Sequence, residues 1–261
     1  MKPIDENKLL YLLLGVFVIT SPITIALRLD FGPILIGLFL TIVYFIGISR
    51  IYDLRVEDLK DFAKKNNYKY IATPNKNLLG KFNKFKCLNS IRSEYEPLFN
   101  LLIPSTENDD PHIVTAKRAI SNSNGGPDKV YYSQLFLFNI GKEIPKFYIR
   151  KKSWFEDFLT GRPKAMIKAF KLTDYFLSYP KNKKFPRKKY FCFVKDDAFE
   201  SFISDRFVEL LNLGIQKGKK QINIESDGKS LLFYVHHRRH SQEDMAYYIN
   251  LFKVLKNSLL Q

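Results

Sequence analysis

Cysteine and acidic side chains are both scarce in this 261-residue chain. Two cysteines, Cys87 and Cys192, exclude a disulfide-stapled scaffold, and a single bridge between them stays open. The 26 Asp and Glu residues are outnumbered by 42 Lys and Arg, which gives a formal net charge of +16. The partners to consider are therefore anionic ones.

Several sequence motifs that carry chemistry are also missing. The chain has no G-x-x-x-x-G-K-[ST], G-x-G-x-x-G, H-E-x-x-H or G-x-S-x-G. Asp196, Asp197 and Glu200 stand where a helix is predicted to begin, and acids at that position stabilise the helix end. Cys87 has basic neighbours but no base nearby in sequence to make it a nucleophile. We therefore expect no cofactor and a binding or structural role rather than catalysis.

Apolar and aromatic residues, in contrast, are plentiful. The chain is 46% hydrophobic and 15% aromatic, which excludes a largely disordered protein. Residues 9–27 and 31–48 contain no charged side chain, and 19 helical residues extend roughly 28 Å, about one hydrocarbon thickness. The pattern predicts a transmembrane helical hairpin over residues 1–52, followed by a basic α+β domain over residues 53–261.

The distribution of Lys and Arg predicts the orientation of that hairpin. One basic residue, Arg28, lies between the two apolar segments, whereas both flanks are richer in Lys and Arg. The flanking basic residues are Lys2, Lys8, Arg50, Arg55, Lys60, Lys64 and Lys65. By the positive-inside rule we expect an inner-membrane protein, integral through two spans, with both termini and the soluble domain in the cytoplasm.

Beyond residue 52 the pattern alternates between helices and strands. Strands are predicted at 68–73, 112–120, 129–140, 146–152 and 189–194, and a hairpin at 221–235 is centred on Asp227–Gly228. Helices are predicted at 53–66, at 198–213 with Gly214 ending the helix, and from Ser241 onward. Hairpins with segregated helices favour an α+β fold with a mainly antiparallel sheet.

Four stretches carry a resemblance to known proteins: FAKKNNYKY after the apolar segments, FNLLI at 99–103, EIPKFYIRKK at 143–152 and the later AFKLTDYFLSYP. The chain resembles a group of bacterial membrane proteins that have two N-terminal spanning helices, a cytoplasmic α+β domain and no established activity. It departs from that group in lacking a His-Pro before the strand at 189–194. The resemblance implies the same architecture and carries no mechanism.

The strongest functional signal is positive charge. Residues 142–195 contain 16 basic and 4 acidic side chains. The residues that we predict to contact anionic lipid or another polyanion are Lys181, Lys183, Lys184, Arg187, Lys188, Lys189, Arg150, Lys151 and Lys152. Phe185 and Trp154 are predicted to add apolar contacts. Lysines outnumber arginines, which fits phosphate contact better than base reading.

Several alternatives to lipid binding stay open. The charge can be a solvated surface, the site of an enzyme tethered at the membrane that acts on an anionic substrate, or a nucleic-acid-binding module. No nucleic-acid motif favours the last, and a protein partner is a further option. His236, His237 and His240 are a weaker candidate for a metal site. Arg238 and Arg239 lie between them and would repel a metal cation.

Overall fold

The computed structural model describes residues 6–26, 32–86, 98–106, 109–120, 129–152, 167, 172, 174–218, 222–235 and 241–260. The chain divides into two compact units, Met1–Asp61 and Phe62–Gln261. The sequence placed the start of the independently folding domain at residue 53. That position stays a prediction.

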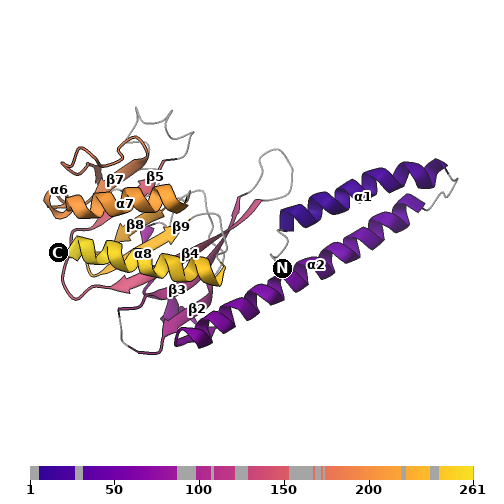
Figure 1. Ribbon diagram of the computed structural model, residues 1–261, viewed down its shortest axis with the longest axis horizontal. Helices are drawn as coiled ribbons and strands as arrows, with labels where there is room; N and C mark the ends of the chain where they lie inside the picture. The colour runs from indigo at the N-terminus through magenta and orange to yellow at the C-terminus, as the bar shows by residue number, and fades with distance from the viewer. Residues whose placement is uncertain are drawn as a thin grey trace. The chain divides into compact units, whose positions relative to one another are not determined.

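The first unit contains two antiparallel helices (Figure 1). They are α1, Glu6–Ala26, and α2, Gly32–Lys65, which runs into the second unit. The helices are in contact near Gly37, where an added Cβ would lie 3.5 Å from the Phe17 ring, an ordinary van der Waals distance. Many other apolar side chains of α1 and α2 are exposed, among them Leu12, Val18 and Phe39.

The two predicted membrane spans are wrong. No helix in the part of the chain that the structure describes is both long and apolar enough to cross a membrane. Two further predictions depended on these spans and are wrong with them: that the protein is integral to a membrane through two spans, and that it lies in the inner membrane with both termini in the cytoplasm.

The second unit is built on one antiparallel sheet, as the sequence predicted. The described strands are β1 Tyr68–Ile71, β2 Phe99–Pro104, β3 His112–Ile120, β4 Lys129–Asn139, β5 Phe147–Lys151, β6 Phe176–Leu177, β7 Tyr190–Val194, β8 Ile222–Ser226 and β9 Ser230–Val235. Their order is β1-β2-β3-β4-β9-β8-β5-β7-β6, and all the pairs are antiparallel.

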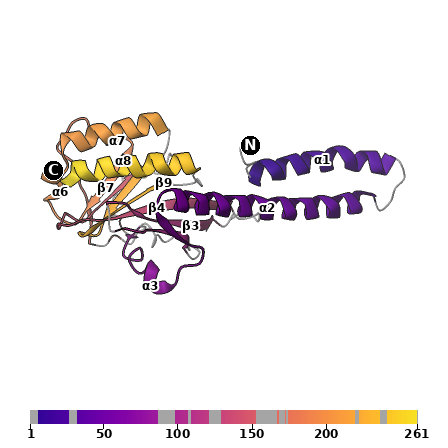
Figure 2. The same ribbon diagram turned by 60° about the horizontal axis from the view of Figure 1, so that its bottom comes forward.

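One face of the sheet is covered by helices. The helices on this face are α6, Phe199–Phe202, α7, Asp205–Gly218, and α8, Gln242–Leu260 (Figures 1 and 2). Phe199 of α6 packs against Phe147 of β5, with 5.1 Å between ring centroids, and Phe252 of α8 packs against Phe136 of β4 at the same distance. Phe252 of α8 stacks on Phe233 of β9 with 4.8 Å between ring centroids. The Ser241 hydroxyl accepts a hydrogen bond from the Asp244 N–H, which confirms the predicted start of α8.

The helix predicted over 198–213 is two helices. Ser204 separates α6 from α7, because its hydroxyl accepts from the Phe207 N–H at 3.1 Å and donates to the Ser258 carbonyl at 2.8 Å. Gly214 does not end α7, which continues to Gly218.

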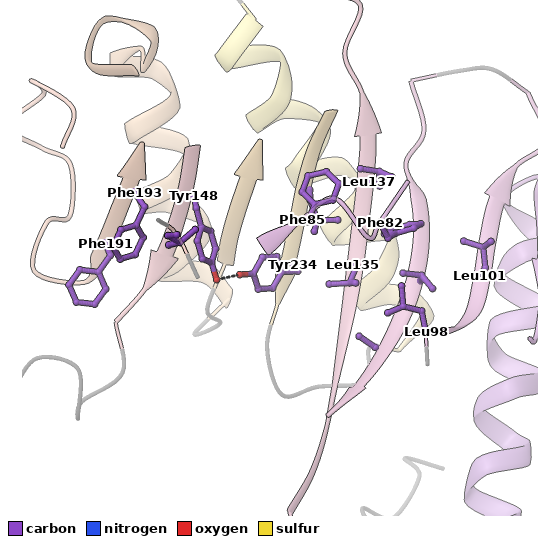
Figure 3. Packing of buried hydrophobic residues seen from close by; sticks show 14 residues of the cluster. Phe82, Phe85, Leu98, Leu101, Leu135, Leu137, Tyr148, Phe191, Phe193 and Tyr234 are labelled. Carbon is purple, nitrogen blue, oxygen red and sulfur yellow. Dashed lines mark hydrogen bonds between the residues drawn. The ribbon is translucent and has the colours of Figure 1, made fainter. Parts of the chain in front are cut away.

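The opposite face of the sheet is covered by the segment that includes α3, Lys76–Leu79 (Figure 2). Phe82 and Phe85 from this segment are fully buried over the leucines of β4. The same cluster contains Tyr148, Phe191, Phe193 and Tyr234 from neighbouring strands (Figure 3). Both faces of the sheet centre are thus dry, which explains why β7 reads as the continuous apolar run YFCFV.

Candidate functional site: a basic rim at the end of β5 and β7

The two basic segments of the sequence lie side by side in the fold. Strand β5 pairs antiparallel with β7, so that Arg150 lies opposite Phe191 and Lys151 opposite Tyr190. The Lys152 N–H then donates to the Lys189 carbonyl at 2.9 Å. We call the combined surface the basic rim; its members are Arg150, Lys151, Lys152, Lys181, Lys183, Lys184, Arg187, Lys188 and Lys189.

The loop that carries most of the basic rim is held from inside. Phe185 is only 3% exposed and packs against the buried Tyr190, with 6.5 Å between ring centroids. The Pro186 carbonyl accepts from the Lys189 and Tyr190 N–H groups at 2.8 and 3.1 Å. Phe185 is therefore an anchor of the loop, and the prediction that it adds an apolar contact at the surface is wrong. Trp154 lies outside the described residues.

The loop is also fastened to α7. The Asn182 side chain donates to the Asp205 carboxylate at the start of α7. About two helical turns further along α7, the Asn212 side chain donates to the Lys184 carbonyl at 3.2 Å. These contacts fix the loop backbone, so the lysines extend from a defined support.

Charges on the basic rim are largely uncompensated. Lys181 approaches Glu200 at 4.0 Å. No carboxylate among the described residues forms an ion pair with the following side chains: Lys151, Lys152, Lys183, Lys184, Arg187, Lys188 and Lys189. The five of these in the loop are exposed and the two at the end of β5 are half-buried. Their positive field is available to an external anion.

The rim covers both sides of the end of the sheet. Successive strand residues point to opposite faces. Lys152 lies over the Phe191 ring, 4.6 Å from its centroid, on the face that carries Tyr148. Lys151 is on the other face, opposite Tyr190. Cations that surround an edge in this way suit an extended anionic surface better than a small enclosed ligand.

The Arg187 side chain is held in a defined position. Its Nη2 donates to the Pro180 carbonyl at 2.8 Å, and its guanidinium carbon is 5.7 Å from the centre of the Tyr179 ring. Burial raises the pKa of Tyr179, although the Arg187 charge opposes that rise. The ring is therefore a neutral support for the guanidinium.

Acidic residues near the rim have structural roles. The Asp196 carboxylate accepts from the Ala198 N–H at 2.9 Å, and Glu200 accepts from the Ser178 hydroxyl at 2.9 Å. Glu200 lies in the first turn of α6, as predicted for an acid at a helix start. The predicted satisfaction of free N–H groups of that helix is not seen, because its N-cap residue Ala198 makes no side-chain cap hydrogen bond.

A buried polar row on the opposite face of the sheet was missed by the sequence analysis. The Tyr148 and Tyr234 hydroxyls are 2.6 Å apart (Figure 3). Glu225 is 2% exposed and accepts from the Lys86 N–H. Burial, followed by the Glu225 charge, raises the pKa of Tyr175 to about 12. Polar Asn223 and Glu225 alternate with isoleucines in β8, and such alternation is typical of a strand with one solvent-exposed face. The sequence does not show that another segment covers this face, so the buried row was missed.

The remaining candidates from the sequence do not form a site in the described part of the chain. His236, His237 and His240 lie outside the described residues, and among those described no group of three or more His, Cys, Asp or Glu could hold a metal. Cys192 is a free, fully buried thiol whose pKa is raised by burial, although Arg187 and Lys152 oppose the rise. Such a thiol is inert. Cys87 is not among the described residues.

Comparison with known proteins adds no assignment. No protein family, no curated protein and no solved structure matches this chain. The function is therefore argued from the basic rim alone.

Proposed function

We propose that the basic rim binds the headgroups of anionic phospholipids. The observation that carries this proposal is the set of rim cations that no described carboxylate neutralises, presented by a loop that is anchored from inside. Each Lys or Arg that comes within a Debye length of an anionic surface contributes about 1 kcal/mol. The contact is peripheral, with headgroup phosphates, and requires no helix that crosses the bilayer.

Lipid headgroups fit the rim better than nucleic acid does. Proteins that bind single strands stack bases on exposed aromatic rings. Among the described aromatic residues next to the rim cations, Phe185, Tyr190 and Phe191 are each at most 3% exposed. The half-buried Tyr179 ring already lies beside the Arg187 guanidinium. Phosphate contact without base contact is what such a surface offers.

A binding role is also favoured over catalysis. The carboxylates nearest the loop, Glu200 and Asp205, hydrogen-bond to Ser178 and Asn182. A general acid or base would have to face the bound anion instead. These contacts support the reading of the rim as a docking surface.

The test is binding of the full-length chain to vesicles. Phosphatidylcholine vesicles are compared with vesicles in which part of the lipid is phosphatidylglycerol. The rim variant carries Lys183→Gln, Lys184→Gln, Lys188→Gln and Lys189→Gln. The control variant removes the same charge from exposed lysines elsewhere and carries Lys69→Gln, Lys76→Gln, Lys81→Gln and Lys84→Gln.

We expect the unmodified chain to prefer the anionic vesicles. The rim variant should lose about fivefold in affinity for each charge that reaches the surface, which corresponds to about 1 kcal/mol. The control variant should lose much less. Equal losses in both variants would contradict the proposal, as would stronger binding to a DNA or RNA duplex at the same salt concentration, which would favour the nucleic-acid alternative.

A further inference from the structure

We propose that Arg187 is a preordered phosphate ligand and that it makes the basic rim prefer phosphomonoester headgroups to phosphodiester headgroups. This inference rests on the proposed function and names the chemical class of its ligand. The argument depends on how Arg187 differs from the lysines around it.

Both ends of Arg187 are held in place. Its backbone N–H donates to the Phe185 carbonyl at 2.8 Å, within the turn closed by Pro186. Its guanidinium donates to the carbonyl of the buried Pro180 and lies beside Tyr179. The Tyr179 ring in turn packs against Phe185, with 6.4 Å between centroids. The anchor of the loop thus also supports the guanidinium.

Preordering lowers the cost of binding. A long side chain that is immobilised on binding loses about 0.5–1.5 kcal/mol of conformational freedom. Arg187 has lost most of that freedom in the free protein. The exposed Lys183, Lys184 and Lys188 have no side-chain hydrogen bond or ion pair with the described residues, and would have to become ordered on binding.

The free donors of Arg187 match a phosphate group. A guanidinium has five N–H donors in a planar fork, and the Pro180 carbonyl takes one of them. No described carboxylate takes the others. A fork of this kind binds two oxygens of one phosphate in parallel.

The charge of the ligand decides which phosphate is preferred. A phosphomonoester carries about −1.5 to −2 at pH 7 and has three terminal oxygens. A phosphodiester carries a single charge and has two. With two oxygens on the Arg187 fork, the third oxygen and the extra charge of a monoester are available to the exposed Lys188, next in the chain. The monoester therefore gains more from the same surface.

The experiment compares two anionic lipids with the full-length chain. Vesicles that contain phosphatidic acid, a phosphomonoester, are matched in surface potential to vesicles that contain phosphatidylglycerol, a phosphodiester. The unmodified chain should bind the phosphatidic acid vesicles on the order of tenfold more tightly, the value of one additional charged hydrogen bond. Glycerol 3-phosphate in solution forms a separate arm.

Arg187→Lys retains the charge and removes the fork. It should abolish the preference and leave binding to phosphatidylglycerol within about twofold. Arg206→Lys is the matched control, since Arg206 is exposed on α7 and pairs with Glu209 at 3.6 Å; it should keep the preference. Tyr179→Leu, which removes the ring support and no charge, is a second variant and should reduce the preference in the same direction. Thermal melts check that each variant is folded.

The outcomes separate the two claims. Equal binding of the unmodified chain to both lipids, or an equal loss for both lipids in Arg187→Lys, overturns the role of Arg187 and leaves the proposed function standing. Failure to bind either anionic vesicle overturns the proposed function itself. Tight binding of glycerol 3-phosphate without vesicles assigns the fork to a soluble phosphomonoester and overturns its assignment to a lipid.

Discussion

Lys256 is a cation in the interior of the second unit. The residue is 4% exposed, its ammonium lies 5.5 Å from the centre of the Phe138 ring, and it pairs with the half-exposed Asp109. Burial lowers the pKa of Lys256 from its usual value. The ammonium therefore loses hydration on folding, and the Asp109 carboxylate replaces only part of that hydration.

We expect the two partners to respond differently to substitution. Asp109→Ala leaves a buried ammonium unpaired and should lower the free energy of unfolding by about 1–3 kcal/mol. Lys256→Met keeps the side-chain volume and leaves only a carboxylate that water reaches, so it should be neutral or stabilising. Denaturant unfolding of both variants measures the difference.

The neighbouring pair is the control for this comparison. Lys253 and Asp110 are 2.6 Å apart and about 30% exposed, so Asp110→Ala should cost less than Asp109→Ala. Equal costs for the two aspartate variants would show that burial of Lys256 is not the cause.

Residue identity alone predicts the charges of the site and not their surroundings. The rim cations are evident from the sequence because they are close together along the chain. Phe185 is buried between Tyr179 and Tyr190 only because the loop folds back on itself. Glu225 is covered by the segment around Phe85, which is far away in sequence. A pattern in a single sequence carries no information about these contacts.

Among the elements, the hairpin of β8 and β9 shows how local chemistry specifies structure. Gly228 has φ +100°, a conformation that side-chain-bearing residues rarely adopt. An added Cβ would also lie 3.1 Å from the Lys146 side chain. The Asp227 carboxylate accepts from the Ser230 N–H at 2.7 Å, which closes the turn.

Gly228→Ala should therefore destabilise the protein by about 1–2 kcal/mol, the cost of the left-handed conformation. The paired control is Gly141→Ala, where nothing lies within 4 Å of the added Cβ and φ is not in that region. This second change should be neutral or stabilise by up to about 1 kcal/mol. Thermal melts that rank the two variants in the reverse order would refute the account of the turn.

Elements were predictable where the signal is local. The aromatic and β-branched runs predicted β3, β4, β5 and β7, and the Asp227–Gly228 pair predicted the hairpin. The break between α6 and α7 was not predictable, because helical spacing of apolar residues continues through it. The break depends on the bond from Ser204 to the Ser258 carbonyl, which is 54 residues away in sequence. Strand β6 has two residues and no pattern of its own.

At the scale of the molecule, the antiparallel α+β class followed from the order of helices and strands, whereas the membrane assignment did not hold. The uncharged composition of residues 9–27 and 31–48 suggested two spans. No spanning helix is found among the residues described. The rim was predictable as two basic segments, and the register of β5 with β7 is what makes them one surface. Such register depends on the whole sheet.

The salt dependence of vesicle binding tests the central claim most directly. Affinity of the full-length chain for phosphatidylglycerol-containing vesicles is measured from about 0.01 M to 0.15 M salt, over which the Debye length falls from about 30 Å to 8 Å. We expect affinity to fall steeply for the unmodified chain and the control variant, and to be weaker and less dependent on salt for the rim variant. Binding that is insensitive to salt, or that is equally steep in the rim and control variants, would contradict the claim that the basic rim is the binding surface.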